Sequence, residues 1–91
     1  MLLVLSTFMP TVERIDTYLH AGNLAEGGRE AHDLVSIAGN YGAVHVSHVA
    51  RELVHACKAS DGKTAATLFD ELKPAAVEAA NVFDEFRRRR A

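Results

Sequence analysis

The stretch Arg29-Glu-Ala-His-Asp-Leu-Val-Ser-Ile-Ala-Gly-Asn-Tyr-Gly42 decides the fold of this chain. It contains no proline, and its apolar residues recur at spacings of three and four, which is the period of an α-helix. These apolar positions are Ala31, Leu34, Ile37, Ala38 and Tyr41. His32 lies off this stripe, on a face of the predicted helix that it shares with Arg29, Val35, Ser36 and Gly39. The stretch therefore predicts a packed helix that presents an imidazole to solvent, with small residues one and two turns beyond it.

Length and composition predict one folded domain that covers residues 1–91. Hydrophobic residues make up 48% of the chain and charged residues 24%, which is too apolar for a disordered protein. Ten Lys and Arg against twelve Asp and Glu give a formal net charge of −2, so no overall field attracts nucleic acid or acidic lipid. Cys57 is the single cysteine, which excludes an internal disulfide and suits a reducing cytoplasm. Because Pro10 and Glu13 interrupt the apolar start, we expect neither a signal peptide nor a membrane span, but a cytoplasmic domain.

Helical spacing of apolar residues recurs along the chain, and no alternating pattern indicates a persuasive strand. We expect a first helix over about residues 3–20, in which Pro10 either produces a kink or lies in the first turn of a helix that begins near Thr7. Gly22 is expected to end the first helix, and a second helix begins near Leu24 and ends at Gly42, because glycine accepts a left-handed backbone. Its early pair of glycines, Gly27 and Gly28, indicates either a loose start or the close approach of another helix.

A third helix is expected from about Val44 to Ala59, and a fourth begins at about Lys63. The inward positions expected in the third helix are Val46, Val49, Ala50, Leu53, Ala56 and Cys57. Pro74 removes one helical hydrogen bond, so the fourth helix should be kinked or split there. The candidate core positions of the fourth helix are Leu68, Phe69, Leu72, Val77, Ala80, Val82, Phe83 and Phe86. Four helices joined by short connections predict an all-α fold, an antiparallel up-and-down four-helix bundle.

The residues around His32 resemble a known phosphoacceptor signature. Ala31-His32-Asp33-Leu34 is followed by Ser36 and Ala38, and Gly39-Asn40-Tyr41-Gly42-Ala43 closes the segment. This pattern resembles the family of histidine-containing phosphotransfer (HPt) domains, in which Ala-His-x-Leu-Lys-Gly-x-Ala precedes a loop such as Gly-Asn-Leu-Gly-Ala. The resemblance covers nearly all of the chain and implies a four-helix bundle with the histidine exposed on its second helix. That architecture agrees with the one predicted from the apolar pattern.

The resemblance implies that His32 receives a phosphoryl group from a receiver-domain aspartate and can return it. A neutral imidazole nitrogen is already a nucleophile, so no general base has to remove a proton before attack. Phosphoryl transfer depends chiefly on in-line positioning and charge compensation. The implied partner holds the Mg²⁺, so we expect no cofactor on this chain. Ser36 occupies the position one turn after His32 where relatives mostly have Gly, and it is small enough to leave room for the phosphoryl group.

Two positions depart from the family pattern. Val35 stands where relatives commonly carry a Lys that balances phosphate charge, and Val54 stands where some carry a Gln that hydrogen-bonds to the imidazole. The positive charge that balances the phosphate can come instead from Arg29, Arg51 or Lys58. Each of these residues is also typical of an ordinary solvated surface cation. We expect Arg29 or Lys58 to take the role of the missing lysine, with Lys58 favoured because relatives place a basic residue there. Val35 can instead enlarge an apolar docking patch.

Other reactive or charged residues give weaker indications of function. His45 and His48 can share a helix face, but no Cys or carboxylate joins them at ligand spacing, so we expect no metal site. Cys57 is expected to be a small core residue rather than a reactive thiol. The run Arg87 to Arg90 is expected to complement the dipole of a helix C-terminus and to remain solvated rather than bind nucleic acid.

These observations predict a phosphocarrier of a two-component multistep phosphorelay, with a response-regulator receiver domain and a hybrid sensor histidine kinase as partners. The chain has no Walker-type glycine-rich loop and no kinase motif, so we do not expect an enzyme with its own ATP site. One alternative is a degenerate HPt-like bundle that docks a receiver or kinase without being phosphorylated. A second alternative is a structural or dimerisation module that pairs through apolar surface near Leu2 to Phe8, so monomer and homodimer both stay open.

Overall fold

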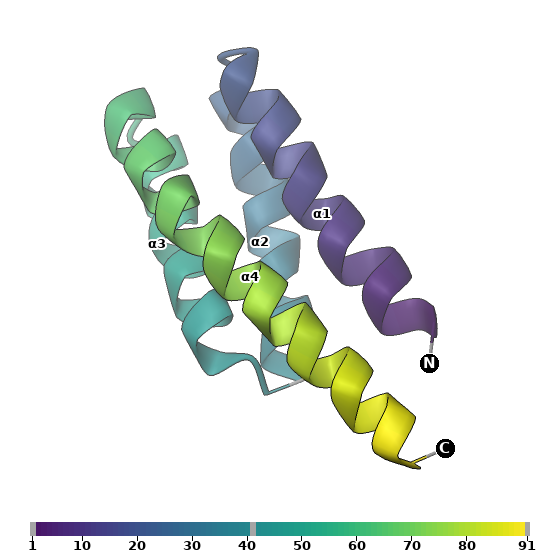
Figure 1. The fold of residues 1–91 in the computed structure, drawn as a ribbon. Helices are drawn as coiled ribbons and strands as arrows, with labels where there is room; N and C mark the ends of the chain where they lie inside the picture. Colours follow the sequence, from purple (N-terminus) through teal and green to yellow (C-terminus); the bar gives the residue numbers. More distant parts are fainter. Residues whose placement is uncertain (1, 41, 91) are drawn as a thin grey trace.

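The computed structural model describes the backbone of residues 2–40 and 42–90, and the side chains of residues 8–40, 42–82 and 85. Four α-helices follow one another along the chain (Figure 1): α1 (Leu2–His20), α2 (Leu24–Asn40), α3 (Val44–Lys58) and α4 (Gly62–Arg90). The described residues contain no strand. Helix α2 packs between α1 and α3, and α4 packs against both α1 and α3. The predicted all-α, up-and-down four-helix bundle is confirmed.

The first three helices end in the same backbone conformation, which makes the short connections possible. Gly22 and Gly42 have positive φ angles of 74° and 77°, and Ser60 adopts the same left-handed region with a φ of 57°. The residue that follows each of them donates its backbone N–H to the carbonyl oxygen of the residue five positions before it. The three bonds are Asn23 to Tyr18 at 2.8 Å, Ala43 to Ala38 at 2.8 Å and Asp61 to Ala56 at 3.0 Å. The helix-terminating roles predicted for the two glycines are confirmed.

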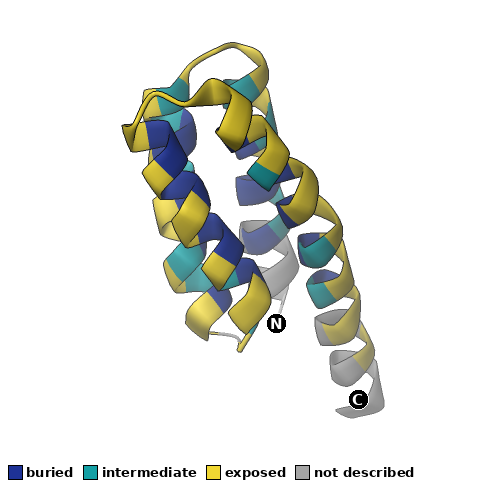
Figure 2. Ribbon diagram, turned by 90° about the vertical axis from the view of Figure 1, so that its left-hand side faces the viewer, coloured by how far each residue is buried: buried dark blue, intermediate teal, exposed yellow. Residues whose placement is uncertain are grey.

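One hydrophobic core runs through the middle of the bundle, where the buried residues of the helices face one another (Figure 2). Helix α2 contributes Ala31, Leu34 and Ala38, all fully buried, as its apolar period predicts. In α3, the six predicted inward positions are all buried, and Val54 joins them at 8% exposure. Phe8 is fully buried, so it adds nothing to the apolar surface expected near Leu2 to Phe8. The predicted core residues Tyr41, Phe83 and Phe86 have side chains outside the described residues, as do Leu2 to Thr7 and Arg87 to Arg90.

Two predicted core positions in α4 are wrong. Val77 is 41% exposed and Val82 is 57% exposed. The buried face of α4 is instead a stripe at spacings of three and four, much of it made of small residues: Ala65, Phe69, Leu72, Ala76 and Ala80. Val77 and Val82 lie outside this stripe, because rotation of the helix, and not the apolar character of a single residue, decides which positions face the core.

Both prolines lie inside continuous helices. Helix α4 runs unbroken through Pro74, so the predicted division into two helices is wrong, and a kink at this position is not confirmed. Pro74 and Asp70 are both exposed, so water can reach the Asp70 carbonyl that would otherwise receive the missing N–H. Helix α1 begins at Leu2, well before Pro10, so Pro10 does not lie in its first turn.

Helices α2 and α3 approach each other closely at Gly28. A Cβ atom added to Gly28 would lie 2.9 Å from the Cβ of Cys57, a separation that two carbon atoms do not tolerate. Of the two explanations for the glycine pair, the close approach of another helix is therefore the correct one. This contact fixes the spacing of α2 and α3 one turn before His32.

None of the helices in the described part of the chain is both long enough and apolar enough to cross a membrane.

Candidate functional site

His32 projects from a helix that is firmly held beneath it. Ala31 and Leu34, its neighbours on α2, are fully buried, whereas His32 itself is exposed, as its place off the apolar stripe predicts. Among the described residues, the imidazole has no hydrogen-bond or ion-pair partner. Both ring nitrogens are therefore available to a reactant that approaches from solvent.

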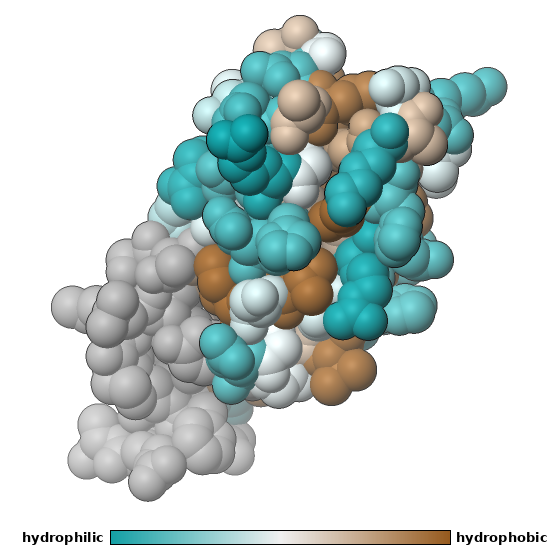
Figure 3. All heavy atoms as spheres, turned by 180° about the vertical axis from the view of Figure 1, so that it is seen from behind, coloured by the Kyte–Doolittle hydropathy of each residue, from teal (hydrophilic) through white to brown (hydrophobic). Residues whose placement is uncertain are grey.

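The imidazole stands at the edge of an open groove between α2 and α3. The groove has a volume of about 290 Å³ and is lined by Leu24, Ala25, Gly28, Arg29, His32, Val54, Cys57 and Lys58. Figure 3 looks onto the bundle from behind, the side on which α2 and α3 lie, and shows apolar residues between columns of hydrophilic ones. The site therefore combines an apolar floor with a polar rim.

Small residues line the floor of this groove, so little of it projects toward solvent. Ala25 and Gly28 bring little bulk from α2, and Cys57 lies directly behind Gly28. The Cys57 side chain is only 6% exposed, and its burial raises the pKa of the thiol. The thiol thus behaves as a small apolar wall, as expected, and offers no thiolate to compete with His32 for an electrophile.

Two cations flank His32, and they differ in whether they already have an ion-pair partner. Arg29 directs its Nη1 toward a carboxylate oxygen of Glu26 at 3.6 Å, one turn earlier on α2. Lys58, which comes from the last turn of α3, has no ion-pair or hydrogen-bond partner among the described residues. The ammonium of Lys58 is therefore the cation at this groove that an incoming anion can engage without displacing a carboxylate.

The remaining residues predicted for the site lie outside the groove. Ser36 and Arg51 are exposed but do not line it. Val35 is half-buried and packs against the core, while its backbone carbonyl accepts a hydrogen bond of 3.0 Å from the hydroxyl of Ser47 on α3. The structure thus brings together Arg29, His32 and Lys58, and it leaves the other three predicted residues apart from them.

Five further groove residues were not predicted as site residues: Leu24, Ala25, Gly28, Val54 and Cys57. The glycine pair in the sequence was a usable signal for one of them, because it indicated a close helix contact at this point of α2. Nothing in the apolar period shows that Leu24 and Ala25 reach the same groove as Cys57, since this depends on how α2 and α3 pack.

Three of the other described histidines have acidic neighbours, and His55, which is exposed on α3, has none among the described residues but does not line the groove. His20 lies 2.8 Å from an Asp16 oxygen, His45 lies 3.8 Å from Glu71, and His48 lies 3.9 Å from Glu52. Within the described residues, no three His, Cys, Asp or Glu side chains come together in a group suited to a metal ion.

A four-helix bundle that presents an exposed histidine beside two cations, with no partner for that histidine among the described residues, is the architecture of a histidine phosphocarrier. The family model of the Hpt domain matches residues 2–84, and the chain belongs to this family. Domains of this family take part in histidine phosphotransfer in phosphorelays, as carriers without an ATP site of their own, and interact with receiver domains and kinases. No curated protein and no solved structure gives a significant match to the chain.

Proposed function

We propose that this protein is a phosphocarrier of a two-component multistep phosphorelay and that His32 is the residue that carries the phosphoryl group. One observation supports this assignment above the others: His32 is the histidine that lines a groove together with two cations and has no acidic partner among the described residues. The donors and acceptors are receiver-domain aspartates, and a hybrid sensor histidine kinase stands upstream. We expect the chain to work in the cytoplasm as a single domain.

The reaction is a direct exchange of the phosphoryl group between two nucleophiles. A ring nitrogen of His32 attacks the phosphorus of an aspartyl phosphate on the receiver, a P–N bond forms, and the P–O bond to the aspartate breaks. The carboxylate leaves, and the proton of the other ring nitrogen can pass to solvent. The Mg²⁺ that compensates the charge of the transferring group resides on the receiver, so the chain needs to supply only position and a little positive charge.

Lys58 supplies that positive charge in this proposal. Arg29 must first give up Glu26, which lies 3.6 Å away, whereas Lys58 is unengaged among the described residues. A lysine is also a compact charge on a flexible stem, so it can follow the phosphoryl group as it moves onto the imidazole. Lys58 thus replaces the lysine that relatives carry at the position of Val35.

Phosphotransfer from a panel of phosphorylated receiver domains tests the assignment of His32. We expect acid-labile, base-stable label on the wild-type chain and none on His32→Ala. His55→Ala is a matched control, because His55 is also an exposed histidine, on the neighbouring helix, and should leave labelling unchanged. Label that persists on His32→Ala, or that disappears from His55→Ala, would contradict the proposal.

A second function is favoured by a specific feature of the groove. Val54 forms part of its wall where some relatives place a glutamine, and it is almost completely buried at 8% exposure, so the groove is more apolar than the phosphotransfer reaction requires. A docking module that binds a receiver or kinase without accepting phosphate would have such a groove. Tight binding to one receiver without any label on the wild-type chain would support this alternative.

A further inference from the structure

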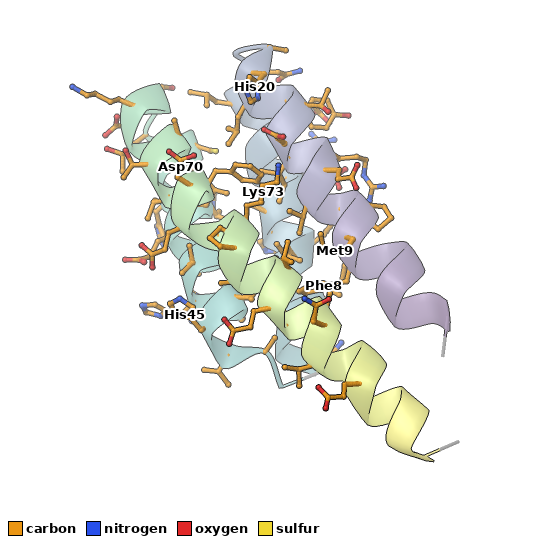
Figure 4. The ribbon with its side chains drawn as sticks, in the orientation of Figure 1. Phe8, Met9, His20, His45, Asp70 and Lys73 are labelled. Carbon is orange, nitrogen blue, oxygen red and sulfur yellow. The ribbon has the colours of Figure 1, made fainter. Side chains whose placement is uncertain are left out.

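A second groove runs along the opposite side of the bundle, between α1 and α4. It consists of two adjoining hollows of about 340 and 390 Å³, which share Asp16, Phe69 and Lys73. Figure 4 shows Met9 toward one end of the space between the two helices and His20 toward the other, with Lys73 reaching from α4 toward α1. The groove is separate from the site of His32, which lies between α2 and α3.

The floor of this second groove is apolar. Phe69 is only 6% exposed and belongs to the core, while Met9 and Leu19 are half-buried against it. A floor of this kind gains free energy when another apolar surface covers it. The α1–α4 interface is also less extensive than the α1–α2, α2–α3 and α3–α4 interfaces, so the two helices leave this part of the core incompletely covered.

The rim of the groove carries more negative than positive charge. Glu13, Asp16 and Asp70 are the acidic residues along it, and Lys73 and His20 are the basic ones. Both basic side chains are already directed at Asp16: Lys73 Nζ lies 3.9 Å from one carboxylate oxygen, and His20 Nδ1 lies 2.8 Å from the other. Glu13 and Asp70 form no salt bridge with any of the described residues, so these two carboxylates remain available to cations from outside.

The shape of the groove suits a helix. On α1 it extends from Met9 to His20, a span of roughly 17 Å at 1.5 Å per residue, which is about three helical turns. The furrow between two antiparallel helices accepts a further helix by ordinary side-chain packing, and the described residues offer no sheet edge to which an extended peptide could add. An occupant therefore needs about three turns, an apolar stripe and flanking positive charges.

We propose that the α1–α4 groove docks a basic amphipathic helix of a partner protein, with the apolar stripe of that helix on Phe69 and Met9 and its Lys or Arg residues against Glu13, Asp16 and Asp70. This binding needs no phosphoryl group and does not depend on the role of His32. Because the two grooves lie on opposite sides of the bundle, the partner helix and a receiver can occupy the chain together.

Lys73 has a distinctive part in this proposal. Its side chain is 56% exposed and reaches Asp16 at the long distance of 3.9 Å, so it occupies by itself the position that a partner cation would take. Removal of the Lys73 charge should therefore strengthen docking of a basic helix, although it removes an ion pair within the bundle. A residue with a purely structural role would have no such effect.

Titration with a designed pair of peptides tests the proposal. Each peptide is a helix of about 12 residues with leucine on one face, and the other face carries only lysine in one peptide and only glutamate in its twin. We expect the lysine peptide alone to bind, with NMR shifts confined to α1 and α4. Asp16→Asn and Asp70→Asn should each weaken binding about threefold, and Lys73→Gln should tighten it about threefold, the size expected for one exposed charge pair.

Two controls make the outcome decisive. Glu52→Gln makes the same change of charge on the exposed face of α3 and should leave the affinity unaltered, and His32→Ala should bind the lysine peptide like the wild type. Equal binding of the two peptides, shifts centred on α2 and α3, or weaker binding by Lys73→Gln would overturn the proposal. So would self-association of the chain, in sedimentation, through an interface that maps to this groove.

Discussion

The α2–α3 interface and the α1–α4 interface of this bundle are built in opposite ways. At the first, Gly28 lets the two backbones approach until even one added carbon atom would collide with Cys57, and Ser47 ties α3 to the carbonyl of Val35. At the second, the helices leave two hollows, and Lys73 spans them at 3.9 Å from Asp16. The tight interface holds the helix that carries His32, whereas the loose one leaves part of the core open to solvent. A small domain can thus reserve its close packing for the helix that must be rigid.

The largest expected effect tests the tight interface. Gly28→Ala should lower the free energy of unfolding by about 2 kcal/mol, because overpacking against Cys57 outweighs the better helix propensity of alanine. Urea unfolding measures the change. Gly27→Ala is the matched control: its new Cβ would lie 3.2 Å from Leu19 Cδ2, the end of a side chain that can move, so we expect no loss of stability there. Equal effects of the two substitutions would show that α2 and α3 are not held at a fixed spacing.

The next effect concerns the two cations beside His32. Lys58→Ala should slow phosphotransfer from a receiver about tenfold, the factor that corresponds to one charge-assisted contact. Arg29→Ala should slow it only about threefold, because Glu26 already engages Arg29. Single-turnover transfer rates measure both. A larger loss for Arg29→Ala than for Lys58→Ala would reverse the roles proposed for the two residues.

A smaller effect tests the loose interface. Ala66 is exposed and lines the α1–α4 groove, so Ala66→Leu should raise the free energy of unfolding by about 0.5 kcal/mol through partial burial of the added methylene groups. Three added carbon atoms would thus be tolerated here, whereas one is not tolerated at Gly28. If urea unfolding shows that Ala66→Leu destabilises the chain as much as Gly28→Ala does, the contrast between the two interfaces is wrong.

The smallest effect is a pH dependence confined to the loose interface. The pKa of His20 is raised above its usual value of 6.5, first by the hydrogen bond that Nδ1 donates to the Asp16 carbonyl and then by the charge of Asp16. Since folding favours the protonated imidazole, this contribution to stability is complete below about pH 6.5 and is lost as the pH rises through the raised pKa. The difference in Tm between the wild type and His20→Gln should therefore be larger at pH 5.5 than at pH 8.5. A difference in Tm that is the same at both pH values would contradict this prediction.

The sequence predicts the tight side of this molecule better than the loose side. In α2 and α3 the apolar residues form one clear stripe between polar ones, so the period alone identifies Leu34, Leu53 and their neighbours as core. Helix α4 is rich in alanine, and its stripe of small residues carries little hydrophobic contrast. Val77 and Val82 therefore looked like better core candidates than Ala65 and Ala76, although the structure exposes both valines.

The candidate site, too, could be predicted only in part from the sequence. His32, Arg29 and Lys58 were predicted from local spacing and from family resemblance, and the structure brings them to one groove. The residues that shape the floor of the groove, Ala25 and Cys57, became visible only in three dimensions. Their proximity depends on the separation of α2 and α3, and a helical period specifies the faces of helices but not the distance between them.

The left-handed residues that end the first three helices also bear on how quickly the chain folds. Gly22, Gly42 and Ser60 turn the backbone so sharply that α1 and α2, α2 and α3, and α3 and α4 each pair with their neighbour in sequence. Contacts that are local in sequence cost little loop-closure entropy, so such a bundle should fold within microseconds to milliseconds. The pairing of α1 with α4 is the exception, because it joins helices separated by the two others. It should form last and open first, and amide hydrogens of α1 should exchange before those of α2.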